Sequence, residues 1–252
     1  MISAHHLVPL APMSDAQLPS PPLSLVSAGQ HEPVEQARKR LKPGERRDQI
    51  LQALAQMLEQ PGAERITTAA LAARLAVSEA ALYRHFASKA QMFEGLIEFI
   101  EQSVFSLVNQ ITERQGLPAA AALAPAGAAS VLDVMTNAQT GVRQAAQVVT
   151  MLLQFAEKNP GMTRVMVGDA LVFENERLQQ RMNLFFDKIE SSLKQSLRAG
   201  AELRGLATPS MDSQVRAAVL MAFVVGRLQR FARSSFKRLP CEHLEASLAL
   251  ML

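Results

Sequence analysis

The 252-residue chain has one cysteine, one tyrosine and no tryptophan. A single cysteine, Cys241, cannot form an intrachain disulfide, so nothing in the sequence asks for an oxidising compartment. Because aromatic residues are scarce, we expect a core of Leu, Ala, Val, Ile and Met, which are mostly good helix formers. No apolar run is long enough to cross a bilayer, and the N-terminus lacks the basic residues of a secretory signal. The sequence therefore predicts a cytoplasmic protein.

Motifs of enzyme chemistry are also missing. The sequence has no Gly-rich phosphate loop, no G-x-S-x-G and no H-E-x-x-H. The five histidines do not have the spacing of metal ligands. Glu98 and Glu101, like Glu174 and Glu176, occur in helical patterns with basic neighbours, which is typical of solvated faces. We therefore expect a protein that is not an enzyme and binds no metal or cofactor.

Positive charge is concentrated in one short segment. Residues 1–37 contain three acidic residues, no Lys or Arg and six of the thirteen prolines, which predicts a disordered tail. Residues 38–89 contain ten basic and five acidic residues, whereas the rest of the chain is almost balanced. This distribution is typical of a protein that binds nucleic acid. The run RKRLKPGERR at 38–47 is either an arm that contacts phosphates or a solvated charge run before a helix.

Apolar residues recur at helical spacing along most of the chain. No window shows the two-residue alternation of a strand, so the sequence predicts an all-α fold. An Ala-rich segment at about 116–130 contains two prolines and two glycines and predicts a flexible connection. Besides the short helices of the motif below, helices are expected at 45–59, 89–112, 130–157, 161–173, 174–204, 211–236 and 241–252.

Two of the C-terminal helices have long apolar stripes. The first stripe comprises Leu178, Met182, Phe185, Phe186, Ile189, Leu193 and Leu197. The second comprises Val215, Ala218, Val219, Ala222, Phe223 and Gly226, on a helix that is apolar around much of its circumference. Helices of this kind pack either within the fold or against a second copy of the chain.

The segment ITTAALAARLAVSEAALYRHFASK, residues 66–89, predicts a helix-turn-helix. Thr67 or Thr68 caps a first helix that runs through Leu75, the chain breaks at Ala76–Val77, and Ser78 caps a second helix that runs through Phe86. In this motif the start of the second helix contacts base edges in the major groove. We predict base contacts by Ser78, Glu79 and Ala80, and phosphate contacts by Thr67, Thr68, Tyr83, Arg84, His85 and Lys89. The alternative to a phosphate contact for Tyr83 is that its side chain only packs between the short helices.

The pattern T-T-x-x-L-A-x-x-[LAV]-x-V-S-x-x-x-L-Y-x-H-F-x-x-K resembles the DNA-binding domain of TetR-family regulators. The resemblance implies a homodimer that binds near-palindromic double-stranded DNA. It also implies a helix-turn-helix domain with a basic arm at 38–90 and a helical dimerisation and partner-binding body at 91–252. Two glycines common in the family are alanines here, one of them Ala76 at the turn. The turn therefore need not use a left-handed residue, and Ala76 is slightly strained if it does.

The segments RRDQILQALAQMLEQ, SEAALYRHFASKAQMFEGLIEFIEQS, FAEKNPGMTRVMVGDALVFENERLQQRMNLFFDKIE and RFARSSFKRLP resemble the nucleoid occlusion factors of this family. The resemblance implies a protein that associates with the nucleoid and inhibits assembly of the division protein FtsZ. It implies an FtsZ site at Phe99, Met151, Lys158 and Asn159. Each of these residues has a purely structural alternative: core packing, a helix stop or a solvated charge. A transcriptional repressor released by a small inducer is the alternative function.

Overall fold

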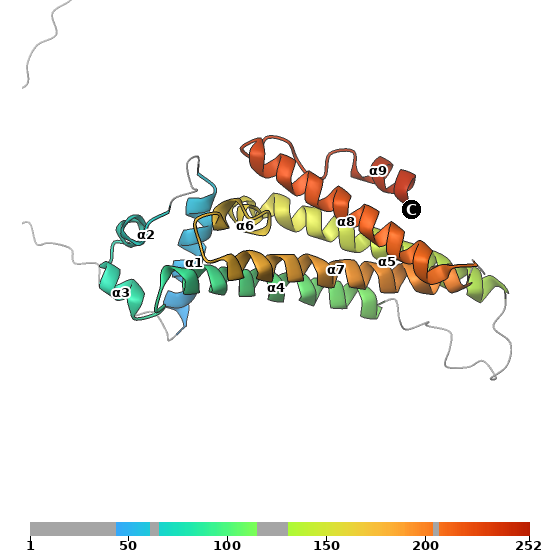
Figure 1. Cartoon of the computed structure of the whole chain (residues 1–252), viewed down its shortest axis with the longest axis horizontal. Coiled ribbons are helices and arrows are strands. Elements are labelled where there is room, and N and C mark those ends of the chain that lie inside the picture. Colours follow the sequence, from blue (N-terminus) through green and yellow to red (C-terminus); the bar gives the residue numbers. More distant parts are fainter. Residues whose placement is uncertain (1–43, 61–65, 115–130, 204–206) are drawn as a thin grey trace, which may run out of the picture. The chain divides into compact units, whose positions relative to one another are not determined.

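The computed structural model describes residues 44–60, 66–114, 131–203 and 207–252, and the regular elements in these ranges are all helices (Figure 1). This confirms the predicted all-α fold. The predicted tail at 1–37, residues 38–43 of the basic arm and the segment at 116–130 lie outside the described residues. The helices are α1 Glu45–Leu58, α2 Thr68–Arg74, α3 Glu79–Tyr83, α4 Lys89–Arg114, α5 Val131–Lys158, α6 Pro160–Met166, the 3-10 turn η2 Asp169–Leu171, α7 Glu176–Leu203, α8 Pro209–Arg233 and α9 Leu244–Met251.

None of the described helices combines the length and the apolar character that a membrane span requires. One predicted boundary is wrong: the helix expected at 161–173 is divided into α6 and η2. Gly168 adopts a left-handed conformation with a φ of 84°, which ends the α-helical path between the two elements.

The second helix of the helix-turn-helix is also shorter than predicted, because it ends at Tyr83 rather than Phe86. The chain turns there to begin α4. The Ser88 hydroxyl accepts a hydrogen bond from the amide of Gln91, and the Gln91 side chain accepts one from the amide of Ala87. This reciprocal capping satisfies amides at the start of α4. Phe86 is buried in the turn and joins the core.

The body is built around α5. Figure 1 shows α4, α5 and α7 side by side, with α8 against α5 and α7. Phe185 of α7 is fully buried and makes edge-to-face contacts with Phe105 and Phe186, at ring-centroid distances of 5.5 and 5.2 Å. A Cβ atom at Gly141 would collide with the carbonyl oxygen of Ser196, so the backbones of α5 and α7 are in direct contact.

A second close backbone contact joins α6 to α1. A Cβ atom at Gly161 would collide with the carbonyl oxygen of Ala55. Because α1 precedes the two short helices and packs on α2 and α4, this contact fixes the helix-turn-helix region against the body. The tertiary arrangement thus links a helix of the predicted DNA-binding domain to the segment that follows α5.

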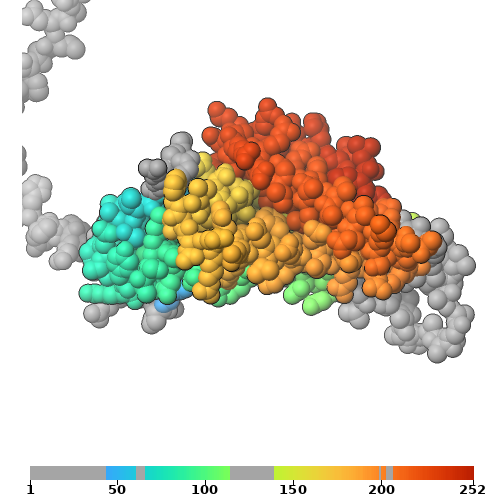
Figure 2. Space-filling view, viewed as in Figure 1, coloured from blue at the N-terminus to red at the C-terminus, as the bar shows by residue number. Residues whose placement is uncertain are grey.

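Helix α8 is apolar on two sides. One side lies in the core and comprises Ala217, Leu220, Met221, Val224, Leu228 and Phe231. The stripe predicted from the sequence is on the other side: Val215 and Val219 are 54% and 49% exposed, and Gly226 has no atom within 4 Å of a Cβ position. In Figure 2, α8 lies uncovered on the displayed surface. Within the single chain, this second apolar side contributes little to the core.

Candidate nucleic-acid interface

Both short helices of the helix-turn-helix begin at the predicted capping residues. The Thr67 hydroxyl accepts a hydrogen bond from the amide of Ala70 at 3.1 Å, and the Ser78 hydroxyl accepts one from the amide of Ala81 at 3.2 Å. Each cap satisfies an amide that the helix itself leaves unpaired. On the inner side, Leu82 is fully buried, which anchors α3. The capping residues therefore determine where each helix starts, and the burial of Leu82 determines which side of α3 faces inward.

The turn between the two helices uses a left-handed alanine. Ala76 has a φ of 51°. Its amide donates to the carbonyl of Ala73, and the next amide, that of Val77, donates to the carbonyl of Ala72 at 3.0 Å. This is a Schellman motif, which closes the C-terminus of α2. Glycine usually takes this position, and a Cβ atom there costs about 1–2 kcal/mol. Of the two alternatives that the sequence left open for this turn, the structure has the strained one, with a left-handed Ala76.

The side chains predicted to contact DNA form one outward surface. Ser78, Glu79 and Ala80 are exposed at the start of α3, Tyr83 is 46% exposed one turn later, and Arg84 and His85 are exposed just after the helix. Positions 79, 80, 83 and 84 share one side of the helix because their spacing is three to four residues. The two first-turn threonines, Thr67 and Thr68, are at the start of α2, with their side chains exposed or half-buried.

Glu79 is held by the neighbouring helix. The Thr68 hydroxyl donates a 2.6 Å hydrogen bond to the Glu79 carboxylate, joining the start of α2 to the start of α3. One carboxylate oxygen is therefore engaged within the chain, while a carboxylate can accept several further bonds. This contact gives Glu79 an orienting role that the sequence did not reveal.

Lys89 is tied to the body of the protein. Its ammonium group lies 2.5 Å from the carboxylate of Glu174, whose side chain is only 10% exposed. Sequence reasoning predicted Lys89 as a phosphate contact and assigned Glu174 to a solvated face. The ammonium has three donors, so it can bind Glu174 and a phosphate together. Glu174 is a site residue that sequence reasoning missed, and no local pattern could have paired it with Lys89.

Arg47 is a second missed residue. Its guanidinium stacks over the ring of Phe86 at 4.3 Å and donates to the carbonyl of His85 at 3.3 Å. It therefore supports the turn that follows α3. The only sequence feature that pointed to Arg47 is its place in the basic run at 38–47. The structure adds that this arginine contacts the turn at the end of α3, the second helix of the helix-turn-helix and its recognition helix.

A groove lies between α1 of the predicted DNA-binding domain and helices of the body. Its volume is about 410 Å³, and Phe99 and Asn159, two of the four predicted partner-binding residues, both line it. Phe99 is 49% exposed, so the alternative that it is a core residue is wrong. The Asn159 side chain donates a 2.7 Å hydrogen bond to the carbonyl of Phe155, which fixes its orientation. The other lining residues are Asp48, Leu51, Gln52, Ala55, Gln56, Glu59, Leu96 and Met162.

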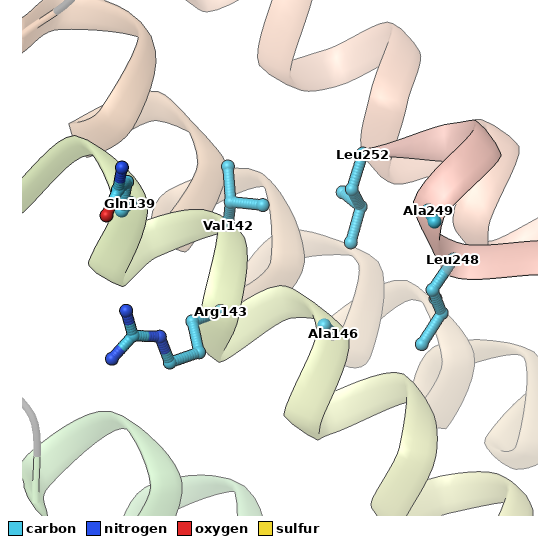
Figure 3. A pocket seen from close by; sticks show the side chains of 7 residues that line it. All are labelled: Gln139, Val142, Arg143, Ala146, Leu248, Ala249 and Leu252. Carbon is cyan, nitrogen blue, oxygen red and sulfur yellow. The ribbon is translucent and has the colours of Figure 1, made fainter. Parts of the chain in front are cut away.

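The other two predicted partner-binding residues lie elsewhere. Met151 is half-buried in a second groove of about 670 Å³, formed by α4, α5 and α9. Lys158 is exposed at the end of α5 and lines neither groove. A further hollow lies between α5 and α9. Figure 3 shows Val142 and Ala146 across from Leu252 there, with Arg143 extending away from α9.

Within the described ranges, no three His, Cys, Asp or Glu side chains are placed to hold a metal ion. The described residues thus form an exposed helix-turn-helix surface with basic neighbours, a groove between α1 and the body, and a second groove on the body.

Comparisons with known proteins agree with this arrangement. Residues 50–96 match the N-terminal model of the bacterial regulatory proteins of the tetR family, and residues 138–252 match a SlmA-like, tetracyclin repressor-like C-terminal domain. The nucleoid occlusion factor SlmA of Aliivibrio fischeri strain MJ11 is 48% identical over 207 residues, which cover 82% of this chain and 93% of the relative. The SlmA of Vibrio cholerae is 47% identical over 207 residues, with the same two coverages.

Solved structures show the same fold at low sequence identity. The fatty acid degradation regulator FadR from Bacillus halodurans aligns with a TM-score of 0.60 and 16% identity, covering 84% of this chain and 96% of that one. A TetR-family transcriptional regulator from Bordetella parapertussis aligns with a TM-score of 0.56 and 15% identity, covering 83% and 95%. These similarities establish the fold.

Proposed function

The chain belongs to the TetR family, in its SlmA-like branch, and we propose that it is a nucleoid occlusion factor: bound at specific chromosomal sites in the cytoplasm, it inhibits FtsZ ring assembly over the DNA. It is a DNA-binding regulator and not an enzyme. The observation that carries the FtsZ part of the proposal is the half-exposed Phe99, which opens with Asn159 onto a groove next to the helix-turn-helix. An exposed aromatic side chain in a groove is a typical anchor for a partner peptide.

For DNA, α3 enters the major groove of the site. Ser78, Glu79 and Ala80 contact base edges from the first turn of α3, where small side chains permit close approach. Thr67, Thr68, Tyr83, Arg84, His85 and Lys89 bind phosphates around them. The exposed, outward arrangement of these side chains supports this assignment.

One helix-turn-helix recognises one half-site, so we propose a homodimer on a near-palindromic sequence. The exposed apolar side of α8 supports this, because burying it against a second copy removes Val215 and Val219 from water. Gly226 permits a close helix approach at the same surface. Dimerisation through α8 would place two copies of α3 on one DNA duplex.

For the division protein, we propose that Phe99 and Asn159 bind the FtsZ tail in the groove of α1, α4 and α6. Met151, in the neighbouring groove, and Lys158, at the end of α5, bind residues of the tail on either side. A repressor released by an inducer needs a ligand space inside the body. The direct backbone contact at Gly141 leaves no such space between α5 and α7 at that point.

The test is sedimentation of FtsZ polymers with GTP, with the protein present and with or without its DNA site. Wild-type protein is expected to reduce the pelleted FtsZ. Phe99→Ala should lose most of this effect and still bind the DNA site. Leu239→Ala is the matched control, because Leu239 is also 49% exposed but lies between α8 and α9. If the amount of pelleted FtsZ is the same with and without wild-type protein, the proposed function is wrong.

A further inference from the structure

The groove beside Phe99 is acidic at both ends of one wall. Helix α1 contributes Asp48, Leu51, Gln52, Ala55, Gln56 and Glu59, a continuous stripe at helical spacing. Asp48 and Glu59 are both exposed and are eleven residues apart, which corresponds to about 16 Å along a helix. Between them, Leu51 and Ala55 form an apolar floor. The groove therefore has a carboxylate, an apolar middle and a second carboxylate.

The opposite wall adds no compensating charge. It consists of Leu96 and Phe99 from α4 and Asn159 and Met162 from the α5–α6 region. Two cations next to lining residues are outside the lining itself: Arg74 donates to the Gln56 side chain at 3.0 Å, and Lys158 is the last residue of α5. The groove itself thus has two negative charges and no positive one.

We propose that this groove selects a peptide segment in which apolar side chains lie between two basic residues about five positions apart. An extended chain advances about 3.3 Å per residue, so five residues span the distance between Asp48 and Glu59. The apolar middle of the segment packs on Phe99, and each basic side chain pairs with one carboxylate. A groove of about 410 Å³ has the volume of a ligand site and not of a domain interface. The inference rests on the proposed function and gives the chemistry of the tail that this groove accepts.

The positions of the charges distinguish this proposal from non-specific binding of apolar peptides. The family resemblance implied that Lys158 is one of the partner-binding residues. The structure places Lys158 outside the lining and Asp48 and Glu59 inside it. An acidic segment in this groove would be repelled at both ends.

The experiment uses fluorescently labelled peptides and the full chain, measured by anisotropy at low and high salt. The probe GKALFARG has its cations five positions apart, GEALFAEG reverses both charges, and GAKLFRAG brings the cations to three positions apart. We expect GKALFARG to bind about fivefold more tightly than either of the others, because one exposed ion pair contributes up to about 1 kcal/mol, which corresponds to about fivefold in affinity.

Two double variants of the protein complete the design. Asp48→Asn with Glu59→Gln should bind GKALFARG about fivefold more weakly and remove its salt dependence. Glu113→Gln with Asp187→Asn removes the same charge from exposed positions outside the groove and should bind like wild type. Circular dichroism checks that both variants keep the wild-type helix content.

The outcomes separate the groove from the function. Equal binding of the three peptides, or unchanged binding in the Asp48/Glu59 variant, overturns the proposal even if FtsZ is inhibited. No binding of any peptide to wild-type protein also overturns it, because the groove then does not accept such a segment. Selective binding of GKALFARG with no effect on FtsZ supports the groove chemistry and contradicts only the proposed partner.

Discussion

The ammonium group of Lys89 lies 2.5 Å from the carboxylate of Glu174, which joins the first residue of α4 to the segment before α7. Helix α4 follows directly on the helix-turn-helix. The ion pair therefore connects the end of the DNA-binding region to the body, at a lysine that we also propose to bind phosphate. The two roles of Lys89 can be separated by changing each partner in turn.

Lys89→Ala should weaken specific and non-specific DNA binding alike, and should reduce the slope of log affinity against log salt by about 0.9. Glu174→Gln removes the same ion pair but leaves the ammonium free, so DNA affinity should be unchanged or higher. Both substitutions should lower the free energy of unfolding by at most about 1 kcal/mol. Filter binding over a salt series measures the slopes. If Lys89→Ala keeps the wild-type slope, Lys89 is a structural residue only.

Tyr83 is the only tyrosine in a chain without tryptophan, so ultraviolet emission reports on one position of the recognition helix. Its side chain is 46% exposed, and bound DNA should cover it. Titration with the DNA site should change the emission and saturate at one half-site per chain. Unrelated duplex at higher salt corrects for absorption by DNA.

Tyr83→Phe removes the hydroxyl and keeps the ring. It should weaken DNA binding by about 1 kcal/mol, the contribution of one neutral hydrogen bond. If tyrosine emission does not change when the DNA site is added, and Tyr83→Phe binds DNA normally, this tyrosine only packs against the neighbouring helices.

Charge on the exposed side of α8 should prevent dimerisation. Val219→Asp is the sharpest variant, because Val219 is 49% exposed in the single chain and its replacement leaves the core intact. Phe223→Asp should act in the same direction but also disturbs the contact of Phe223 with Arg227, whose guanidinium lies 4.9 Å from the ring centroid. Sedimentation equilibrium should give a folded monomer that binds the full DNA site weakly.

Leu250→Asp, at a position that is 89% exposed on α9, is the control and should remain dimeric. A Val219→Asp monomer with full affinity for the DNA site would contradict the requirement for a dimer.

The close contact of α5 with α7 predicts a strong effect of one added methyl group. Gly141→Ala should lower the free energy of unfolding by about 1–3 kcal/mol or more, because the new Cβ meets a backbone carbonyl that cannot move aside. Gly95→Ala should cost less, since its nearest atoms, at 3.3 Å, belong to the side chains of Leu51 and Phe86. Urea unfolding compares the two. Equal stability of Gly141→Ala and wild type would mean that α5 and α7 are farther apart.

Cys241 should be an unreactive thiol at neutral pH. Burial, its hydrogen bond to Glu157 and the charge of that carboxylate together raise the pKa of the thiol to about 12. Alkylation by iodoacetamide at pH 8 should therefore be much slower in the folded chain than in urea. Glu157→Gln removes the carboxylate charge and should lower the thiol pKa, which should speed alkylation.

The sign of the pH effect on stability follows from the raised pKa. Above pH 9 the unfolded thiol loses its proton while the folded thiol keeps it, so stability falls between about pH 9 and pH 12. Cys241→Ser should flatten this part of the stability profile. An unchanged profile, or alkylation as fast as in urea, would rule out the raised pKa.

Local chemistry made much of the fold predictable. The all-α class follows from the apolar spacing, and the caps at Thr67 and Ser78 are set by residue types that satisfy helix amides within three positions. Phe99 and Asn159 were predicted from a family resemblance, and their shared groove was not. Lys158 and Met151 were predicted with them and lie outside that groove, because sequence similarity gives positions along the chain but not distances across the fold.

Interactions between neighbours in the chain specify the helices, their caps, the helix-turn-helix motif and the concentration of basic residues near it. The tertiary structure decided the rest. A helix that is apolar on two sides, such as α8, can bury either one, and only its packing on α5 and α7 left Val215 and Val219 outside. Pairs such as Lys89 with Glu174 depend on where whole helices meet. That position is set by close contacts such as Gly161 on Ala55, which no local pattern encodes.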